Sequence, residues 1–321
     1  MLLGLDTNSY RLATGLYEYQ PARPLGLRGV LTRAADLGLA GVHIANPHLI
    51  ESTDPGYLAD VRRAAEAAGL YLELGAHGTD AQQLREAIEV AAMLGAPILR
   101  TFVGADRQRG WAAWRQQLDR AVDGLKQVVP VAKQAGVRIA LENHGDLTSP
   151  ELVNLLDKVG SDQVGACLDT GKSLLVVDDP QVAAQNLVPY LVTACLTDYQ
   201  LIPTARGARV VGCALGEGVV ALNSIVQLLR QRRPDLHLNV ESPVQSWELP
   251  FLEDKFWDDF YDRGPKDLAA ILRLMRQHPL RPDVDYRTPL ERGLTEEEIL
   301  RHEDQMLRRS VAYAKHLLLA T

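Results

Sequence analysis

The sequence predicts a (β/α)₈ barrel, an α/β fold in which eight parallel strands alternate with helices. Eight short apolar runs alternate with longer amphipathic segments along the chain, which is typical of repeated βα units. Glycines that can close a helix in the left-handed conformation precede several of the runs: Gly38, Gly69, Gly95 and Gly136. No glycine-rich phosphate loop follows the first run, which disfavours the alternative of a doubly wound open sheet.

The predicted strands are the eight apolar runs, which are rich in leucine or β-branched residues. They span residues 2–6, 41–45, 70–74, 97–102, 137–142, 164–169, 191–196 and 236–241. Apolar residues recur three and four apart in the segments between them, which predicts amphipathic helices. The clearest of these helices cover residues 27–37, 55–68, 80–94 and 111–134. Residues 1–278 are assigned to the barrel.

Two segments exceed a minimal barrel. The first is an aromatic-rich insertion over residues 244–262, after the eighth strand, which either caps the barrel mouth or forms a subunit contact. The second is a helical tail over residues 279–321. Thr295 and Glu298 have the spacing of a capping box, and we expect the helix that follows to pack on the barrel or on another subunit.

Composition limits the classes of protein that the chain can belong to. Its 321 residues are 46% hydrophobic and 23% charged, as in an ordinary globular domain. The net charge of −7 argues against a nucleic-acid partner. No apolar stretch is long enough for a membrane span and the first residues lack a basic signal sequence, so we expect a soluble cytoplasmic protein. Its three cysteines, Cys167, Cys195 and Cys213, are predicted to be reduced.

Acidic residues close three of the predicted strands. Glu142 ends the fifth strand, Asp169 the sixth and Glu241 the eighth. Residues at these strand ends point into the mouth of a barrel, where active sites lie. A single carboxylate there is usually structural or solvated, but three at one level repel one another, and a divalent cation can hold them together. An all-carboxylate set favours Mg²⁺ or Mn²⁺.

Other residues are predicted to surround this cluster. His144 follows Glu142 by two positions and shares its face of the strand, so it is either a general base or a histidine bonded to a loop carbonyl. Arg100 ends the fourth strand and either binds an anionic substrate or pairs with a carboxylate. His43 and His77 are predicted to be structural. The candidate substrate-binding residues are Arg100, Asn143, Lys172 and Trp257.

Four motifs carry a resemblance to a known family. They are Leu-Glu-Asn-His-Gly-Asp at 141–146, Cys-Leu-Asp-Thr-Gly-Lys at 167–172, Leu-Thr-Asp-Tyr at 196–199 and Val-Glu-Ser at 240–242. Together they resemble the xylose isomerase-like barrel superfamily over nearly the whole chain. Residues 248–257 and 308–314 are similar to the branch with 3-oxo-isoapionate decarboxylases and the catalytic α subunits of 3-oxo-C-glucoside deglycosidases.

The resemblance implies a metal site and a base. Glu142, Asp169 and Glu241 match three of the usual four metal ligands, whereas Cys195 stands where the family commonly has a histidine. Cys195 either ligates as a thiolate, which shifts the preference toward zinc, or stays neutral and leaves three carboxylates with water or substrate. A weak or absent metal is the remaining alternative. His144 matches the base of the deglycosidases.

The implied chemistry passes through an enediolate. A metal bound to an α-hydroxy ketone acidifies the adjacent C–H, and His144 or a carboxylate, Glu142 or Glu241, removes the proton. We expect a lyase acting on a 3-oxo carbohydrate, by decarboxylation of a 3-oxo sugar acid or cleavage of a 3-oxo-C-glycoside. The alternatives are a sugar isomerase or epimerase and a non-catalytic binding subunit. A homo-oligomer is expected, with a small β-rich partner subunit as a further option.

Overall fold

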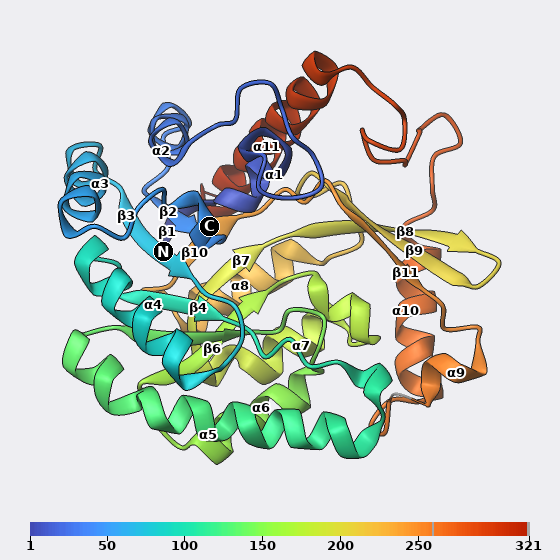
Figure 1. The fold of residues 1–321 in the computed structure, drawn as a ribbon. Coiled ribbons are helices and arrows are strands. Elements are labelled where there is room, and N and C mark those ends of the chain that lie inside the picture. The colour runs from blue at the N-terminus through green and yellow to red at the C-terminus, as the bar shows by residue number, and fades with distance from the viewer. Residues whose placement is uncertain (259, 320–321) are drawn as a thin grey trace.

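Eight parallel strands close into a barrel in the computed structural model, which describes residues 1–258 and 260–319 (Figure 1). The barrel strands are β1 (Leu2–Asp6), β2 (Gly41–Ile44), β3 (Tyr71–Gly75), β4 (Ile98–Thr101), β5 (Arg138–Glu142), β6 (Val164–Asp169), β7 (Leu191–Leu196) and β10 (His237–Val240). The ring closes where β1 pairs with β10 on one side and β2 on the other. The predicted fold is therefore confirmed, and each predicted strand lies within one residue of its observed ends.

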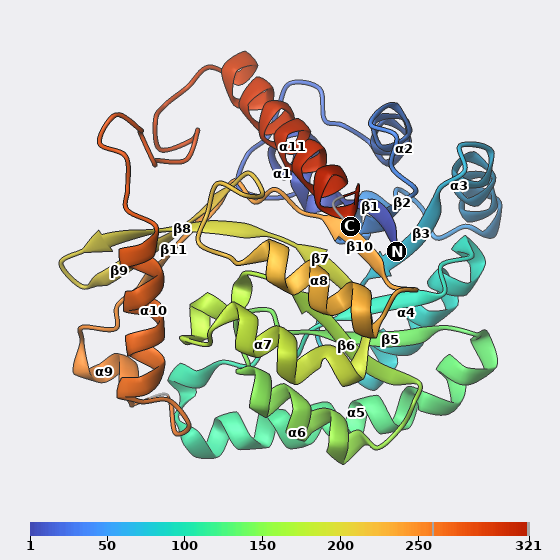
Figure 2. The same ribbon diagram turned by 180° about the vertical axis from the view of Figure 1, so that it is seen from behind.

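Helices surround the barrel on its outer side (Figures 1 and 2). They are α2 (Leu27–Asp36), α3 (Pro55–Ala67), α4 (Ala81–Leu94), α5 (Trp111–Ala135), α6 (Ser149–Val159), α7 (Pro180–Leu187), α8 (Leu222–Arg232) and α11 (Glu296–Leu319). All four clearest helix predictions are confirmed. Their apolar stripes are buried against the strands, as the periodicity requires.

The C-terminal helix α11 is the eighth helix of this ring. It contacts α1 (Arg11–Thr14), β10 and α8, and its buried face includes Leu307 and Val311. The predicted capping box is present, since Thr295 Oγ1 lies 2.8 Å from Glu298 Oε2 and the Glu298 N–H donates back to the threonine. The last two residues of the predicted 279–321 tail lie outside the described part of the chain.

A small antiparallel sheet projects from the carboxyl end of the barrel. Strands β8 (Asp198–Thr204) and β9 (Gly207–Cys213) form a hairpin between β7 and α8, and β11 (Ser246–Leu249) pairs with β9. The predicted insertion thus supplies β11 and α9 (Asp254–Trp257), and α10 (Pro265–Gln277) follows it. The hairpin was not predicted, because β8 begins only one residue after β7 and its sequence, with Asp198, Gln200 and Pro203, forms no clear apolar run.

The interior of the barrel is polar, whereas the layer between strands and helices is apolar. Glu73 of β3 is fully buried there and accepts hydrogen bonds from Thr193 Oγ1 at 3.0 Å and Asn239 Nδ2 at 2.9 Å. His237 Nδ1 lies 2.7 Å from the same carboxylate. Burying a carboxylate is costly unless it is bonded in this way, so Glu73 ties β3 to β7 and β10 beneath the mouth.

The three cysteines are free, as predicted. None of the helices in the described chain combines the length and apolarity that a membrane crossing requires.

Candidate functional site

Three carboxylates from different strands converge on one ammonium group, that of Lys172. Glu142 ends β5, Asp169 ends β6 and Glu241 follows β10. The Nζ atom lies 3.2 Å from the first, 3.5 Å from the second and 3.8 Å from the third. The side chains are almost completely buried, the lysine being 5% exposed. The carboxylates therefore meet at the mouth, as the strand ends predict, and a lysine occupies their centre.

The turn after β6 carries Lys172 into this position. Asp169 Oδ1 accepts hydrogen bonds from the N–H groups of Gly171 and Lys172, at 2.9 and 2.8 Å, and from Thr197 Oγ1 at 2.6 Å. Residue 171 has to be glycine because a Cβ there would lie 2.4 Å from the Tyr199 ring. Since Oδ1 is used in the turn, Asp169 presents only Oδ2 to the mouth, where it has no hydrogen-bond partner among the described residues.

Both oxygens of Glu142 face cationic or N–H groups. Arg100 Nε forms an ion pair with Oε2 at 2.6 Å, and His144 Nδ1 lies 2.7 Å from Oε1. Burial by itself raises the pKa of this carboxyl, but Arg100, Lys172 and His144 outweigh it and hold the pKa well below the ordinary value. Glu142 is therefore ionised, and Arg100 forms the ion pair that the sequence left as one of its two alternatives.

His144 is the member of the cluster that reaches solvent. Its side chain is 30% exposed and its ring stacks on Phe102 with a centroid distance of 4.1 Å. When Nδ1–H is donated to Glu142, the lone pair of the neutral ring lies on Nε2. Lys172 Nζ is 3.3 Å from the ring nitrogen Nδ1. The arrangement is that of an oriented base next to an ammonium group.

Glu241 has one oxygen near Lys172 and another that is unused. Its Oε2 is buried and accepts no hydrogen bond from the described residues. Burial, with Asp6 and Asp169 nearby, raises the pKa of Glu241 to about 8, although Lys172 opposes the shift. Together with Asp169 Oδ2, this oxygen can form a hydrogen bond with a hydroxyl group of a ligand.

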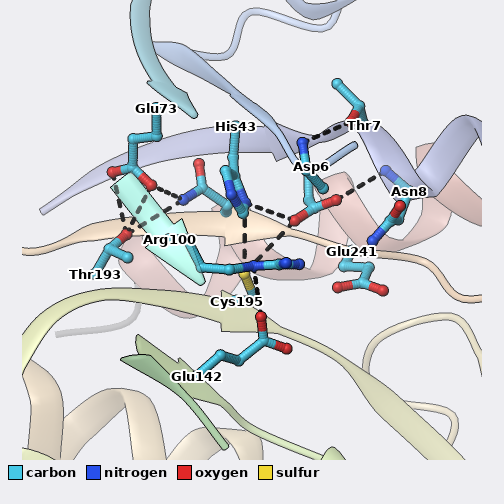
Figure 3. Close-up of polar contacts among 12 residues, drawn as sticks. Asp6, Thr7, Asn8, His43, Glu73, Arg100, Glu142, Thr193, Cys195 and Glu241 are labelled. Carbon is cyan, nitrogen blue, oxygen red and sulfur yellow. Dashed lines mark hydrogen bonds and ion pairs between the residues drawn. The ribbon is translucent and has the colours of Figure 1, made fainter. Parts of the chain in front are cut away.

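A second polar layer, centred on Arg100, lies directly beneath the carboxylate cluster (Figure 3). Asp6 Oδ2 is 2.7 Å from His43 Nδ1 and 3.6 Å from Cys195 Sγ. His43 is fully buried, and its Nδ1 contact orients Asp6. The hydrogen bond with Cys167, burial and nearby negative groups raise the pKa of the Cys195 thiol well above its usual value, so it stays protonated.

Two donor sets can be tested for a metal ion. The predicted set of Glu142, Asp169 and Glu241 does not fit as it stands, because Lys172 Nζ lies between the carboxylates. Within residues 1–258 and 260–319, one group of possible metal ligands is close enough to share an ion. It consists of Asp6, His43 and Cys195, whose ligand atoms all lie within 4.8 Å of one another. This triad could hold a divalent metal ion, and its imidazole and thiol suit zinc better than Mg²⁺ or Mn²⁺.

The other predicted site residues have mainly structural contacts. The Asn143 side chain donates to the carbonyl of Asp169 at 2.9 Å and accepts from its N–H at 2.8 Å, so it joins β5 to β6. Trp257 Nε1 donates to the carbonyl of Phe251 at 2.9 Å, within the insertion. His77 lies beside Phe102, with ring centroids 5.5 Å apart.

Two residues of the site were missed from the sequence. Asp6 ends β1, so the strand-end rule that identified the other carboxylates could also have found it. Tyr199 lies on the unpredicted strand β8, is 1% exposed, and its hydroxyl has no partner among the described residues. Its ring lies over Gly171 and meets Trp247 of β11 edge-on at 5.8 Å. The small sheet therefore covers the mouth with aromatic rings.

Comparison with known proteins places this chain in a family. Residues 31–278 match the xylose isomerase-like TIM barrel family. The chain is 24% identical over 253 residues to a 3-oxo-isoapionate decarboxylase from Pectobacterium atrosepticum, covering 78% of this chain and 87% of that protein.

Solved structures share the fold at low sequence identity. A D-allulose 3-epimerase from Methylomonas sp. in complex with D-allulose has a TM-score of 0.63 and 18% identity, over 98% of this chain and 96% of that one. The IOLI protein with a bound zinc atom has a TM-score of 0.60 and 13% identity, over 87% and 98%. The chain belongs to the xylose isomerase-like TIM barrel family.

Proposed function

We propose that the protein is a lyase acting on a 3-oxo carbohydrate, either a 3-oxo sugar acid or a 3-oxo glycoside, through an enolate. The family and its relatives, a decarboxylase and several epimerases among them, fit a sugar-modifying enzyme. The observation that carries the lyase proposal is the combination of a solvent-reaching imidazole, oriented by Glu142, with the ammonium of Lys172. An enolate-forming reaction needs both groups, one for the proton and one for the oxyanion.

Decarboxylation uses these groups as follows. In a 3-oxo sugar acid the carboxylate is β to the ketone, and breaking the bond to the carboxylate carbon releases CO₂. The bonding electron pair moves onto the ketone oxygen, giving an enolate that an ammonium donor can stabilise. Protonated His144 can then deliver a proton to carbon, which restores the ketone, and water reprotonates the imidazole.

A 3-oxo glycoside reacts through the same intermediate. Neutral His144 can take the proton from the carbon between the ketone and the anomeric carbon, and the electron pair again moves onto the ketone oxygen. When this electron pair returns from the oxygen and re-forms the ketone, the bond from the anomeric carbon to the leaving group breaks, and the leaving group gains a proton. In either reaction Glu241 Oε2 and Asp169 Oδ2, which have no hydrogen-bond partner among the described residues, can form hydrogen bonds with hydroxyl groups of the sugar.

The geometry disfavours a two-carboxylate epimerase. Removing a proton from one face of a carbon and returning it on the other needs a free base on each side. Glu142 is a poor candidate for either base, because Arg100, His144 and Lys172 engage its oxygens and keep its pKa low. Decarboxylation needs only one proton donor, which the cluster has. An Mn²⁺ or Mg²⁺ ion, which the sequence predicts, would require Lys172 to leave the centre of the carboxylates.

The test is turnover of a 3-oxo sugar acid and a 3-oxo glycoside by the purified full chain. We expect release of CO₂ from the first or of the aglycone from the second, with loss of this activity in His144→Gln. His316→Gln, at an exposed histidine of α11, is the matched control. Aldose–ketose exchange or solvent deuterium incorporation without bond cleavage would contradict the lyase and identify an isomerase or epimerase. Tight sugar binding with no turnover of any kind would identify a binding protein.

A further inference from the structure

We propose that the ammonium group of Lys172 is the cation of the active site, and that no divalent ion binds between Glu142, Asp169 and Glu241. One part of this proposal, the assignment of the ammonium to the enolate oxygen, rests on the proposed function. The other part, that a side chain takes the place of an ion, depends only on the contacts of the cluster.

The Nζ atom of Lys172 lies among the three carboxylates. Its three carboxylate contacts, at 3.2, 3.5 and 3.8 Å, come from three different strands, and the lysine reaches them from the turn after β6. Its backbone N–H is bonded to Asp169 Oδ1, so the turn that positions Asp169 also directs Lys172. An ammonium held in this way supplies the charge that like-charged carboxylates need.

The carboxylates retain few oxygens that could bind an ion. Arg100 lies 2.6 Å from one oxygen of Glu142, and His144 lies 2.7 Å from the other. Asp169 uses Oδ1 for the turn, which leaves Oδ2. A divalent ion bound to Glu142 would therefore lie next to the cationic side chains of Arg100 and Lys172, and like charges at close range in a buried site repel strongly.

Strand β7 lies between β6 and β10 in the barrel. The thiol of Cys195 on β7 does not face Lys172; it lies 3.6 Å from Asp6 Oδ2 and 3.9 Å from His43 Nδ1, in the layer beneath. Strand β7 thus contributes no ligand to the carboxylate cluster in the described chain. Hard cations such as Mn²⁺ prefer oxygen ligands over a protonated thiol.

A role follows for the ammonium once substrate binds. Among the described residues, only Lys172 combines a buried positive charge with contacts to the three mouth carboxylates. A protonated amine has N–H bonds that can turn from Glu241, at 3.8 Å, to an enolate oxygen. The lysine would act as an ammonium donor and form no covalent bond to the substrate.

Mn²⁺ is the probe for testing this proposal, because its binding can be followed by electron paramagnetic resonance without any substrate. Full-length wild-type protein, dialysed against a chelator, is titrated with Mn²⁺ beside Lys172→Ser and the exposed-lysine control Lys133→Met. We expect Lys172→Ser to bind the ion about tenfold or more tightly than the other two proteins, because the carboxylates lose their internal cation. Mn²⁺ should also raise the Tm of Lys172→Ser alone, which keeps the test readable if that variant folds poorly.

Equal Mn²⁺ affinity in wild type and Lys172→Ser would overturn the proposal, as would stoichiometric binding by wild type that Glu241→Gln abolishes. A borohydride-trapped adduct between Lys172 and a 3-oxo sugar would also overturn it, because the lysine would then be a nucleophile. If a 3-oxo carbohydrate is turned over, activity should survive the chelator. If no such substrate is turned over, the proposed function is wrong, but the Mn²⁺ comparison still tests the role of Lys172.

Discussion

At the scale of single residues, buried carboxylates and buried cations partly compensate one another in the site. The carboxylates of Asp6, Glu142 and Asp169 face two buried cations, Arg100 and Lys172, while Glu241, whose pKa is raised to about 8, is largely protonated at neutral pH. Removing either partner of a buried ion pair leaves an uncompensated charge, which is far more costly than losing a surface pair. The residues of this cluster therefore contribute to stability and to chemistry together, and variants have to be measured for both.

Glu142→Gln removes the shared partner of Arg100, Lys172 and His144. We expect the free energy of unfolding to fall by about 3–5 kcal/mol, since Arg100 is left without its ion pair in the barrel. Activity should fall at least about 100-fold because His144 loses the acceptor that orients it. Denaturant unfolding and turnover of the 3-oxo substrate measure the two effects. Glu248→Gln, at an exposed residue of β11, is the control, and unchanged stability in Glu142→Gln would contradict the buried pair.

His144→Gln separates chemistry from stability. The ring is partly exposed and pairs with Glu142 from the rim of the mouth, so we expect a small change in Tm. The turnover number should fall about 10²–10⁴-fold, the usual contribution of a general acid or base. Circular dichroism melts and steady-state kinetics give the comparison. A variant that keeps wild-type kcat would assign the histidine to a purely structural role.

At the scale of elements, the small sheet of β8, β9 and β11 decides what covers the mouth. Strand β8 brings Tyr199 over Gly171, and β11 brings Trp247 against Tyr199. The close approach of β9 to the chain before β11 depends on Gly212, whose N–H donates to the carbonyl of Gln245 at 2.9 Å.

Gly212→Ala should disturb this sheet without touching the barrel. A Cβ at residue 212 would lie 1.8 Å from the carbonyl oxygen of Pro243, so the backbone has to shift, at a cost of about 1–3 kcal/mol. Gly264→Ala is the matched control, because a Cβ there meets nothing within 4 Å. Differential scanning calorimetry of both variants tests the expectation. Similar Tm values for the two would show that β9 and residue 243 are not in close contact.

At the scale of the whole molecule, the last helix closes the barrel against the first residues of the chain. Glu303 of α11 is fully buried and accepts hydrogen bonds from the N–H groups of Leu12 at 2.7 Å and Ala13 at 3.0 Å. Burial raises the pKa of its carboxyl to about 8, although the two N–H groups oppose the shift.

This buried carboxyl predicts a pH-dependent stability. Between about pH 4.5, the ordinary value for glutamate, and the folded value of about 8, the unfolded chain releases the proton while the folded chain keeps it. The folded state then binds more protons, so stability is highest at the acid end of this window and falls as the pH rises to about 8. Glu303→Gln should lose that part of the decline. Melts of both proteins from pH 5 to pH 8 test this, and parallel curves would contradict it.

The strands and most of the site could be predicted because both depend on local signals. Apolar runs, glycine caps and the carboxylates that end β5, β6 and β10 are readable within a few residues of sequence, and the barrel brings such strand ends together. The hairpin β8–β9 was missed because its first strand follows β7 after one residue and begins with polar residues rather than a separate apolar run. Asp6 was missed although it obeys the same rule as the other carboxylates.

The sequence by itself determined the barrel, its family and the ring of acidic strand ends, since these follow from periodicity and from chain order. Only the tertiary structure decided which charges meet. Lys172 and Arg100 have long side chains that reach across strands, and their shared partner Glu142 lies 30 residues from the first and 42 from the second along the chain. The position of an ammonium among three carboxylates depends on how the turn after β6 packs beneath Tyr199, and no local pattern encodes that contact.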